Sequence, residues 1–364
     1  MALTLTFFGK GGTGRTTAAI ATAKQLASQG KRVLLASQDP SPAFPLLLGA
    51  EVGPDPQAIT PNLEVVQFQT TVLVERGWQE IKQLEKQYLR TPVLKEIFGQ
   101  ELGILPGVDG VLGMNALREY EEAGRYDVMV YDGSGDLPLL RILGTPEILS
   151  WYVRRLRQVW SGSDLGKALS PFLQPIAAAT MTVNLFDDNF AEPTQQTNNR
   201  LDQGKAAIAN PNRFAGYLVA TEDSASLATA KYLWGSAQQI GLRMGGLILN
   251  QATSTEAISQ DFSPLPIASL PTKAADDWQP LMDALPDFSQ VAQMPAPIEI
   301  DEANSQIRLF LPGFDKKQVK LTQYGPEITV EAGDQRRNIY LPGRLSGRSV
   351  TGAKFQFPYL ILSL

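Results

Sequence analysis

The chain has 364 residues, enough for two or three domains, and its 43% hydrophobic and 19% charged residues are ordinary for a globular protein. It contains no cysteine and no histidine, which excludes disulfides, thiolate metal sites, thiol redox switches and an imidazole base. The net charge of −5 predicts no general attraction to nucleic acid. Catalysis must therefore use carboxylates, hydroxyls, cations, backbone groups and a metal held by oxygen.

The N-terminus shows no signal peptide, because the chain enters its first apolar run almost at once. No uninterrupted apolar run in the sequence is long enough to span a bilayer. We therefore expect a cytoplasmic protein that does not insert directly into a membrane.

The first predicted elements are a buried strand over 3–8 and a helix over 16–27, with the glycine-rich turn Gly9–Thr17 between them. Glycines let the amides of such a turn converge on an anion, beside the positive end of the helix. The spacing fits the phosphate-binding loop G-x-x-x-x-G-K-[ST], with Arg15 in place of the usual lysine and the Thr16 hydroxyl as a magnesium ligand. The predicted nucleotide-binding residues here are Gly9, Gly11, Gly12, Thr13, Gly14, Arg15, Thr16 and Thr17.

A second interpretation of this turn is a dinucleotide fingerprint, G-x-G-x-x-G, formed by Gly9, Gly11 and Gly14. Asp39 then follows the next strand at about the right separation to bind a ribose. Two cations, Lys10 and Arg15, and two hydroxyls in the turn favour a triphosphate and a metal instead. The motif by itself leaves both interpretations open.

The middle of the chain alternates apolar strands with helices. Strands are predicted over 31–37, 63–68, 126–131, 215–220, 244–249 and 265–270. Helices are predicted over 72–89, 116–123, 147–160, 165–176, 225–240 and 274–285, with a loop over 99–113. Continuously apolar strands suit parallel sheets covered on both faces, so the pattern predicts an α/β fold with a mostly parallel sheet flanked by helices.

Two aspartates follow strands of this predicted sheet. Carboxylates at the carboxyl ends of parallel strands face the usual ligand crevice. Asp132 closes a hydrophobic strand, as in a Walker B arrangement, where the carboxylate holds magnesium through water. Asp39 follows the strand 31–37 and is predicted to act beside the metal; the alternative is a simple turn cap before Pro40.

The pattern of residues 9–17 resembles the deviant Walker A loop of the arsenite-pump ATPase family, which includes the targeting ATPase for tail-anchored membrane proteins. The resemblance implies a homodimer in which Lys10 reaches the partner's nucleotide, and a first switch in which Asp39 orients the attacking water. It also implies that Asn250, followed by Gln251, binds the adenine edge, because an amide can donate and accept together. The base would pack near Pro271 and Thr272.

The run 139–146 resembles the second switch of that family, although only Asp132 and a Leu-Arg-hydrophobic-Leu tail match the family's pattern. In the targeting ATPases, helices inserted after this point form a hydrophobic groove for a client helix. The corresponding insertion here is about 147–200. Its apolar residues either form such a groove or pack in the core.

Beyond a proline-marked linker the pattern changes to strands with period two. The run Leu-Pro-Gly-Phe-Asp-Lys-Lys-Gln-Val-Lys at 311–320 resembles the α-crystallin domain of small heat-shock proteins. We therefore expect a P-loop ATPase domain over 1–288 and a β-sandwich domain over 296–364, a combination found in a cyanobacterial and plastid subgroup of the family. The sandwich either contacts other proteins or only braces the ATPase domain.

These resemblances imply a magnesium-dependent, dimeric ATPase with ATP and Mg²⁺ as its cofactors and Lys10, Arg15 and Asp39 as catalytic residues. The magnesium site would comprise Thr16, Asp39 and Asp132. The expected role is a chaperone or targeting factor for hydrophobic protein segments; the alternative is a nucleotide-binding scaffold with little hydrolysis. An anion-pump subunit ranks lower, because arsenite capture in that family uses cysteine thiolates and this chain has none.

Overall fold

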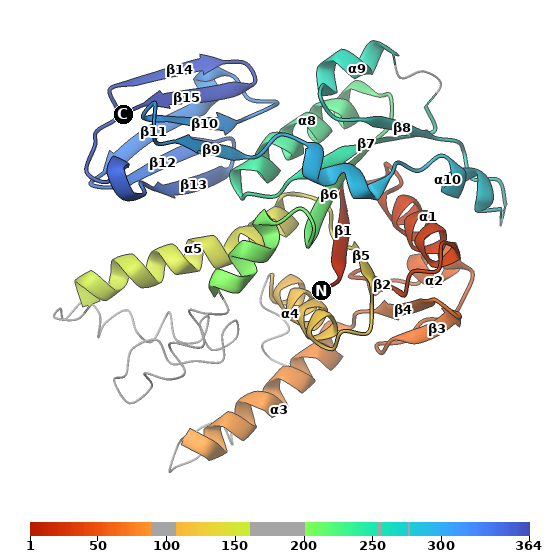
Figure 1. The fold of residues 1–364 in the computed structure, drawn as a ribbon. Coiled ribbons are helices and arrows are strands. Elements are labelled where there is room, and N and C mark those ends of the chain that lie inside the picture. Colours follow the sequence, from red (N-terminus) through yellow and green to blue (C-terminus); the bar gives the residue numbers. More distant parts are fainter. Residues whose placement is uncertain (89–106, 161–200, 253–255, 276) are drawn as a thin grey trace.

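A computed structural model describes residues 1–88, 107–160, 201–252, 256–275 and 277–364 (Figure 1). Its centre is an eight-stranded sheet in which all neighbours are parallel except β3 and β4. Across the sheet the strands are β3 (Gln57–Thr60), β4 (Leu63–Gln67), β2 (Val33–Ser37), β5 (Val128–Asp132), β1 (Leu3–Phe8), β6 (Phe214–Ala220), β7 (Met244–Asn250) and β8 (Ile267–Leu270).

Helices cover both faces of this sheet. They are α1 (Arg15–Ser28), α2 (Ala43–Leu48), α3 (Thr70–Tyr88), α4 (Val108–Glu122), α5 (Leu137–Trp160), α8 (Ser224–Gln239), α9 (Glu256–Phe262) and α10 (Gln279–Asp283). Helices α1, α2 and α10 share one hydrophobic core, and α4, α5, α8 and α9 share the other. In β5, Met129 and Tyr131 enter the second core while Val128 and Val130 enter the first, so the strand is apolar throughout.

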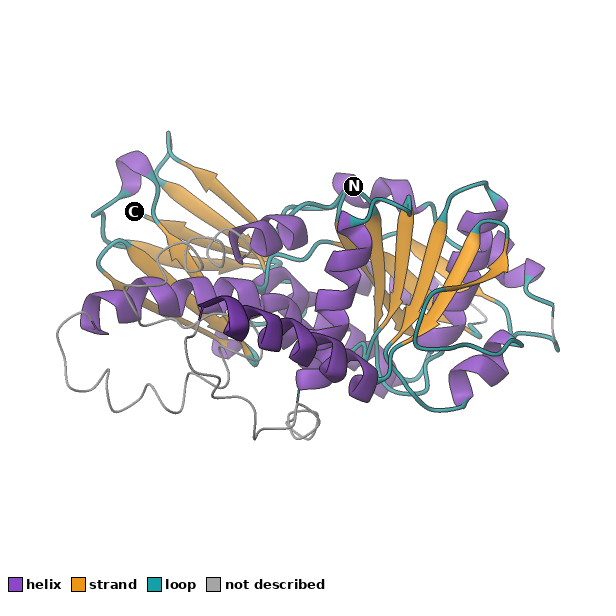
Figure 2. Ribbon diagram, turned by 90° about the horizontal axis from the view of Figure 1, so that it is seen from below, coloured by secondary structure: helices purple, strands orange, loops and turns teal. Residues whose placement is uncertain are grey.

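The C-terminal strands form a sandwich of two antiparallel sheets with a separate core. One sheet has the order β14 (Gly352–Gln356), β15 (Tyr359–Ser363), β10 (Gln306–Phe310) and β9 (Ile298–Asp301). The other has the order β11 (Val319–Tyr324), β12 (Glu327–Ala332) and β13 (Gln335–Tyr340). Seen from below, the sandwich and the large sheet lie on opposite sides of a group of helices (Figure 2).

The predicted α/β class with a mostly parallel sheet and a C-terminal β unit is confirmed. Two strands were not predicted. Strand β3 is a short, largely exposed antiparallel edge with little hydrophobic signal. Strand β11 alternates exposed and half-buried residues and carries most of its polar side chains outward.

The loop predicted over 99–113 is wrong for its last residues, because α4 already begins at Val108. Glycines suggested a loop, but Gly110 and Gly113 lie inside the helix. A Cβ at Gly110 would lie 2.2 Å from Ile142 Cδ1, and one at Gly113 would lie 2.1 Å from Gln38 Oε1. The side-chain ends of Ile142 and Gln38 thus occupy the space that a Cβ would take at these two helical positions.

The start predicted for the helix at 147 is also wrong, since α5 runs from Leu137 through Pro146 without interruption. The Thr145 hydroxyl donates to the Arg141 carbonyl within the helix (2.9 Å). The run that resembles the second switch is therefore helical. The predicted helix 165–176 and most of the insertion 147–200 lie outside the described residues.

The helix predicted over 274–285 is reduced to α10, Gln279–Asp283. Before it, Ala275 has a φ of 43° and Ala274 forms an isolated bridge with Asp277, so this stretch cannot be helical. Within the described ranges, no helix combines the length and the apolar character that a bilayer crossing requires.

Phe314 anchors the sandwich core and is 1% exposed, whereas Phe357 is 68% exposed. We expect Phe314→Ala to lower the free energy of unfolding of the sandwich by about 3 kcal/mol, because it leaves a cavity and removes buried apolar surface. The matched change Phe357→Ala should cost less than about 0.5 kcal/mol. Denaturant unfolding of both variants measures the difference, and equal losses would contradict this packing.

Candidate functional site

The carboxyl ends of the parallel strands meet at one edge of the large sheet, as expected at a topological switch point. Strand β1 lies between β5 and β6, and the glycine turn leads from its end into α1. Asp132 is the last residue of β5, and Asn250 is the last residue of β7. The tertiary structure thus brings segments from distant parts of the sequence to the turn.

The turn is held by hydrogen bonds to its neighbours. The Thr13 hydroxyl donates to the Lys10 carbonyl (2.9 Å), and the Asn250 amide donates to the Thr13 carbonyl (3.0 Å). The Gly9 amide donates to the Gly135 carbonyl (2.9 Å). A Cβ at Gly9 would lie 2.1 Å from the Val219 carbonyl of β6, so only glycine fits there.

The outer side of the turn is open. Gly12 and Gly14 have φ values of 85° and 93°, which glycine adopts without strain. Among the described residues, no heavy atom lies within 4 Å of a Cβ built at Gly11 or Gly12. Gly14 is the N-cap of α1 without a side-chain cap, so the first amides of this helix face the turn. Such a turn can receive a phosphate group.

Asp132 is buried at the centre of this edge and is 5% exposed. Burial raises the pKa of its carboxyl to about 6, although a hydrogen bond with Thr16 and the charge of Arg15 oppose the shift. The charge of Asp39 raises the pKa further. Hence Thr16, Arg15 and Asp39, three predicted site residues, all act on this one carboxylate.

The Arg15 side chain points inward, toward the loop that follows Asp132. A Cβ at Gly135 would lie 2.0 Å from its Nη1 atom. Burial lowers the pKa of Arg15, while the carboxylates of Asp132 and Asp136 oppose the shift. Nη1 is buried and has no hydrogen-bond partner among the described residues, so the guanidinium retains a donor for an anion.

The other two predicted catalytic residues are exposed. The Asp39 carboxylate accepts hydrogen bonds from the Ser41 amide (2.9 Å) and hydroxyl (2.8 Å), which is the geometry of a turn cap. Lys10 lies near Asp223: a hydrogen bond from Thr221 lowers the pKa of Asp223 most, and the charge of Lys10 adds to the shift. Lys10 is thus beside a carboxylate of its own subunit.

The residues predicted to bind the base lie at the ends of β7 and β8. The Gln251 amide donates to the Leu270 carbonyl (2.9 Å), which holds these two ends together. Gln251, Pro271 and Thr272 are exposed. Asn250 is buried, and its side-chain amide serves the turn through Thr13.

The donor set suits a magnesium–nucleotide pair. Among the described residues no group of three or more carboxylates lies together, so the protein alone offers no cage for a metal. A hydroxyl, Thr16, and one buried carboxylate, Asp132, do lie together beside the open turn. Magnesium commonly binds in this way, with phosphate and water oxygens completing its shell. Thr17, next in α1, is half-buried.

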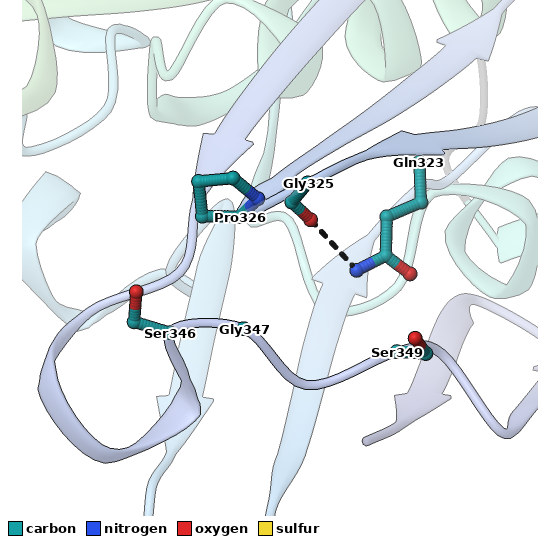
Figure 3. Close-up of a pocket in the computed structure, with 6 residues that line it drawn as sticks. All are labelled: Gln323, Gly325, Pro326, Ser346, Gly347 and Ser349. Atoms are coloured by element: carbon teal, nitrogen blue, oxygen red, sulfur yellow. Dashed lines mark hydrogen bonds between the residues drawn. The ribbon is translucent and has the colours of Figure 1, made fainter.

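A polar cleft in the sandwich lies apart from this edge (Figure 3). It is lined by Gln323, Gly325, Pro326, Ser346, Gly347 and Ser349. The Gln323 amide donates to the Gly325 carbonyl (3.1 Å) and the Arg348 carbonyl (2.7 Å), and its oxygen accepts from the Val350 amide (2.8 Å). Gln323 therefore joins the β11–β12 turn to the following loop and offers no reactive group.

Three contributors to the site were not singled out from the sequence as site residues. Gly135 and Asp136 contact or act on Arg15, and Asp223 lies near Lys10. The sequence did offer a signal for Asp136, because this second acid follows Asp132, at the end of a hydrophobic strand, on the same loop. For Asp223 the sequence pattern indicated only the N-cap of a helix and gave no sign that it lies near Lys10.

The raised pKa of Asp132 predicts an unusual pH dependence of stability for the protein without added metal or nucleotide. The native carboxyl takes up its proton near pH 6, above the value of about 3.9 for the unfolded chain, so protonation favours the native state. From about pH 7.5 to about pH 5, Asp132 should add roughly 1 kcal/mol to the free energy of unfolding. Denaturant unfolding should show this gain in the wild type and not in Asp132→Asn; equal pH profiles would contradict it.

Comparisons with known proteins agree with this geometry. A model described as an anion-transporting ATPase matches residues 3–271, and one described as an HSP20-like domain found in ArsA matches residues 302–364. The second match confirms the predicted likeness of the tail to small heat-shock proteins.

Individual relatives resemble the chain over most of its length. A protein from Aquifex aeolicus, named as a candidate arsenical pump-driving ATPase, is 23% identical over 96% of both chains. A relative of the same description from Chlorobaculum tepidum is 23% identical over 98% of this chain and 94% of its own. The ATPase GET3 of Malassezia globosa is 30% identical over 46% of this chain and 47% of its own. With a family match that covers most of its length, this chain belongs to the anion-transporting ATPase family.

Proposed function

We propose that the chain is a magnesium-dependent ATP hydrolase that works as a homodimer and handles hydrophobic protein segments. The observation that carries the proposal is the hydrogen bond of Thr16 with buried Asp132, with the charge of Arg15 nearby, beside an open glycine turn. Membership of an ATPase family supports the same reaction. The ATPase domain would span residues 1–288 and the sandwich residues 296–364.

In the proposed site, the amides of the glycine turn and Arg15 bind the β- and γ-phosphates. Thr16 and Asp132, with Asp39 nearby, would hold the magnesium ion, Thr16 through its hydroxyl and Asp132 through its carboxylate. The ion, when bound, neutralises charge on the phosphate oxygens. Thr13, Gly9 and Thr17 shape the turn and its helix, and Asn250, Gln251, Pro271 and Thr272 border the base.

The proposed reaction joins the oxygen of water to the γ-phosphorus while the bond from that phosphorus to the bridging oxygen breaks. Asp39 positions the water. Lys10 of the opposite subunit neutralises charge that develops on the transferred group, and such a positioned cation contributes several orders of magnitude in rate. Lys10 is exposed, so it is accessible to a second subunit.

A single-turnover assay tests the role of Lys10. We expect Lys10→Ala to lower the rate of ATP hydrolysis by about 100-fold or more, because the transition state loses a positioned charge. The exposed Lys31, at the far end of α1, provides the matched control Lys31→Ala.

Mixed subunits sharpen this test. A dimer of one Lys10→Ala and one Asp39→Ala subunit contains one site with both residues intact only if Lys10 acts across the dimer. Mixing the two inactive variants should therefore restore hydrolysis. An unchanged rate in Lys10→Ala, or no recovery on mixing, would refute the cross-dimer role.

A second candidate function is a nucleotide-binding scaffold with little turnover, and the position of Arg15 favours it. Its planar guanidinium packs over Gly135 and cannot replace the point charge of a lysine without change. The two candidates differ in turnover: tight ATP binding without hydrolysis in the wild type, with hydrolysis gained in Arg15→Lys, would favour the scaffold.

Capture of a hydrophobic client tests the proposed role. Ile148 and Tyr152 on α5 are 39% and 47% exposed, at the described start of the insertion. We expect an immobilised apolar helix to capture the protein in a nucleotide-dependent manner, and Ile148→Ser/Tyr152→Ser to weaken capture. Phe357→Ser, at a more exposed position on the sandwich, should not. Capture that is absent, or indifferent to ATP, would reject a targeting role.

A further inference from the structure

Two helices connect the nucleotide edge to the sandwich. Helix α5 begins at Leu137, shortly after Asp132, and α8 begins after its N-cap Asp223, close to the end of β6. Both helices run from this edge toward the C-terminal strands (Figure 1). The sandwich therefore lies against α5, which follows the loop 132–136, and against α8, which follows Asp223 near Lys10.

The contact with α8 is close enough to involve backbone. A Cβ at Gly235 would lie 2.3 Å from the Pro312 carbonyl, and one at Gly313 would lie 2.3 Å from the Lys231 carbonyl. The Gln239 side chain donates to the Val330 carbonyl (3.3 Å). Tyr232 and Phe314 pack edge to face at 5.5 Å. Packing this tight leaves little room for the sandwich to move independently of α8.

The β12–β13 hairpin extends the contact to α5. Asp334, at its tip, pairs with Arg141 in the first turns of α5. The Arg336 guanidinium lies 5.1 Å from the centre of the Trp151 ring. Because the Arg141–Asp334 pair is largely exposed, it contributes little by itself.

Arg337 joins the same hairpin to the end of α8. Its Nη1 donates to the Gln238 carbonyl at the end of α8 (2.8 Å), where a cation also complements the helix dipole. Its guanidinium end is enclosed although part of the side chain stays accessible, and burial lowers its pKa to about 10, opposed by the charge of Glu147 on α5. The hairpin thus binds α8 through Arg337 and α5 through Asp334 and Arg336.

We propose that Arg337 is a positioning residue for ATP hydrolysis, holding α5 and α8 in a fixed relation through the sandwich. The loop 132–136 and the segment 221–223 precede these helices, so their relative position follows that of the helices. The inference rests on the proposed function, and it gives the sandwich a part in catalysis.

Steady-state hydrolysis by the full-length protein tests this role. We expect Arg337→Gln to lower kcat about fivefold while the KM for ATP stays within about twofold. The reason is that the contact fixes the alignment of residues around bound ATP and does not bind ATP itself. Arg337→Lys, which keeps the charge, should recover part of kcat. The matched control is Arg308→Gln, because Arg308 contacts Glu299 and Tyr359 within the sandwich itself.

Hydrogen exchange provides a readout that does not depend on turnover. Adding ATP and magnesium should change amide exchange in the hairpin 327–340 of the wild type, and this response should vanish in Arg337→Gln. Should that variant fail to fold, the exposed change Asp334→Asn is used, and it should reduce the response.

The outcomes separate the two proposals. The positioning role would be overturned, and the proposed function left standing, by either of two results. One is ATP hydrolysis without any change in amide exchange in the hairpin 327–340; the other is an equal loss of kcat in Arg337→Gln and Arg308→Gln. A hairpin that responds to ATP in a protein that does not hydrolyse it would support the coupling and reject the hydrolase.

Discussion

The burial of one carboxylate determines the design of the nucleotide edge. Asp132 ends a strand that is enclosed on both faces, and its charge is stabilised by a hydrogen bond with Thr16 and by the charge of Arg15. A buried charge needs partners, because its desolvation is costly. The inward direction of Arg15 and the position of Thr16 at the start of α1 follow from this requirement. The same environment leaves the turn itself open toward solvent.

A second constraint is the close approach of backbones. Gly9 lies against β6, Gly135 against Arg15, and Gly235 against the Leu-Pro-Gly-Phe segment of the sandwich. In each case a side chain on the glycine would collide with a backbone carbonyl, which cannot easily move: that of Val219, Phe7 or Pro312, respectively. The segment that most resembles a small heat-shock protein is thus also the surface that contacts α8. In this chain, that segment packs the sandwich against α8.

Sequence reasoning succeeded where a residue's role follows from its local pattern. Continuous apolar runs predicted the parallel strands, and the glycines predicted the turn between β1 and α1. Phosphate binding by that turn stays a prediction. It failed where tertiary contacts override local preference. Gly110 and Gly113 suggested a loop but lie inside α4, and Pro146 suggested a helix start but lies within α5. The cap formed by Asp39 with Ser41 agrees with the simpler of its two interpretations, and its catalytic role stays a prediction.

By itself, the sequence determined the class of fold, the family and the residues of the turn, because hydrophobic period and glycine spacing are local properties of a chain. Only the tertiary structure decided which distant groups meet: that Asn250 donates to the Thr13 carbonyl, that Arg15 faces the loop after Asp132, and that Arg337 donates to the Gln238 carbonyl at the end of α8. These contacts join residues that are far apart in the sequence, so they depend on the order of the strands and on helix packing. The local hydrophobic period does not specify either of these.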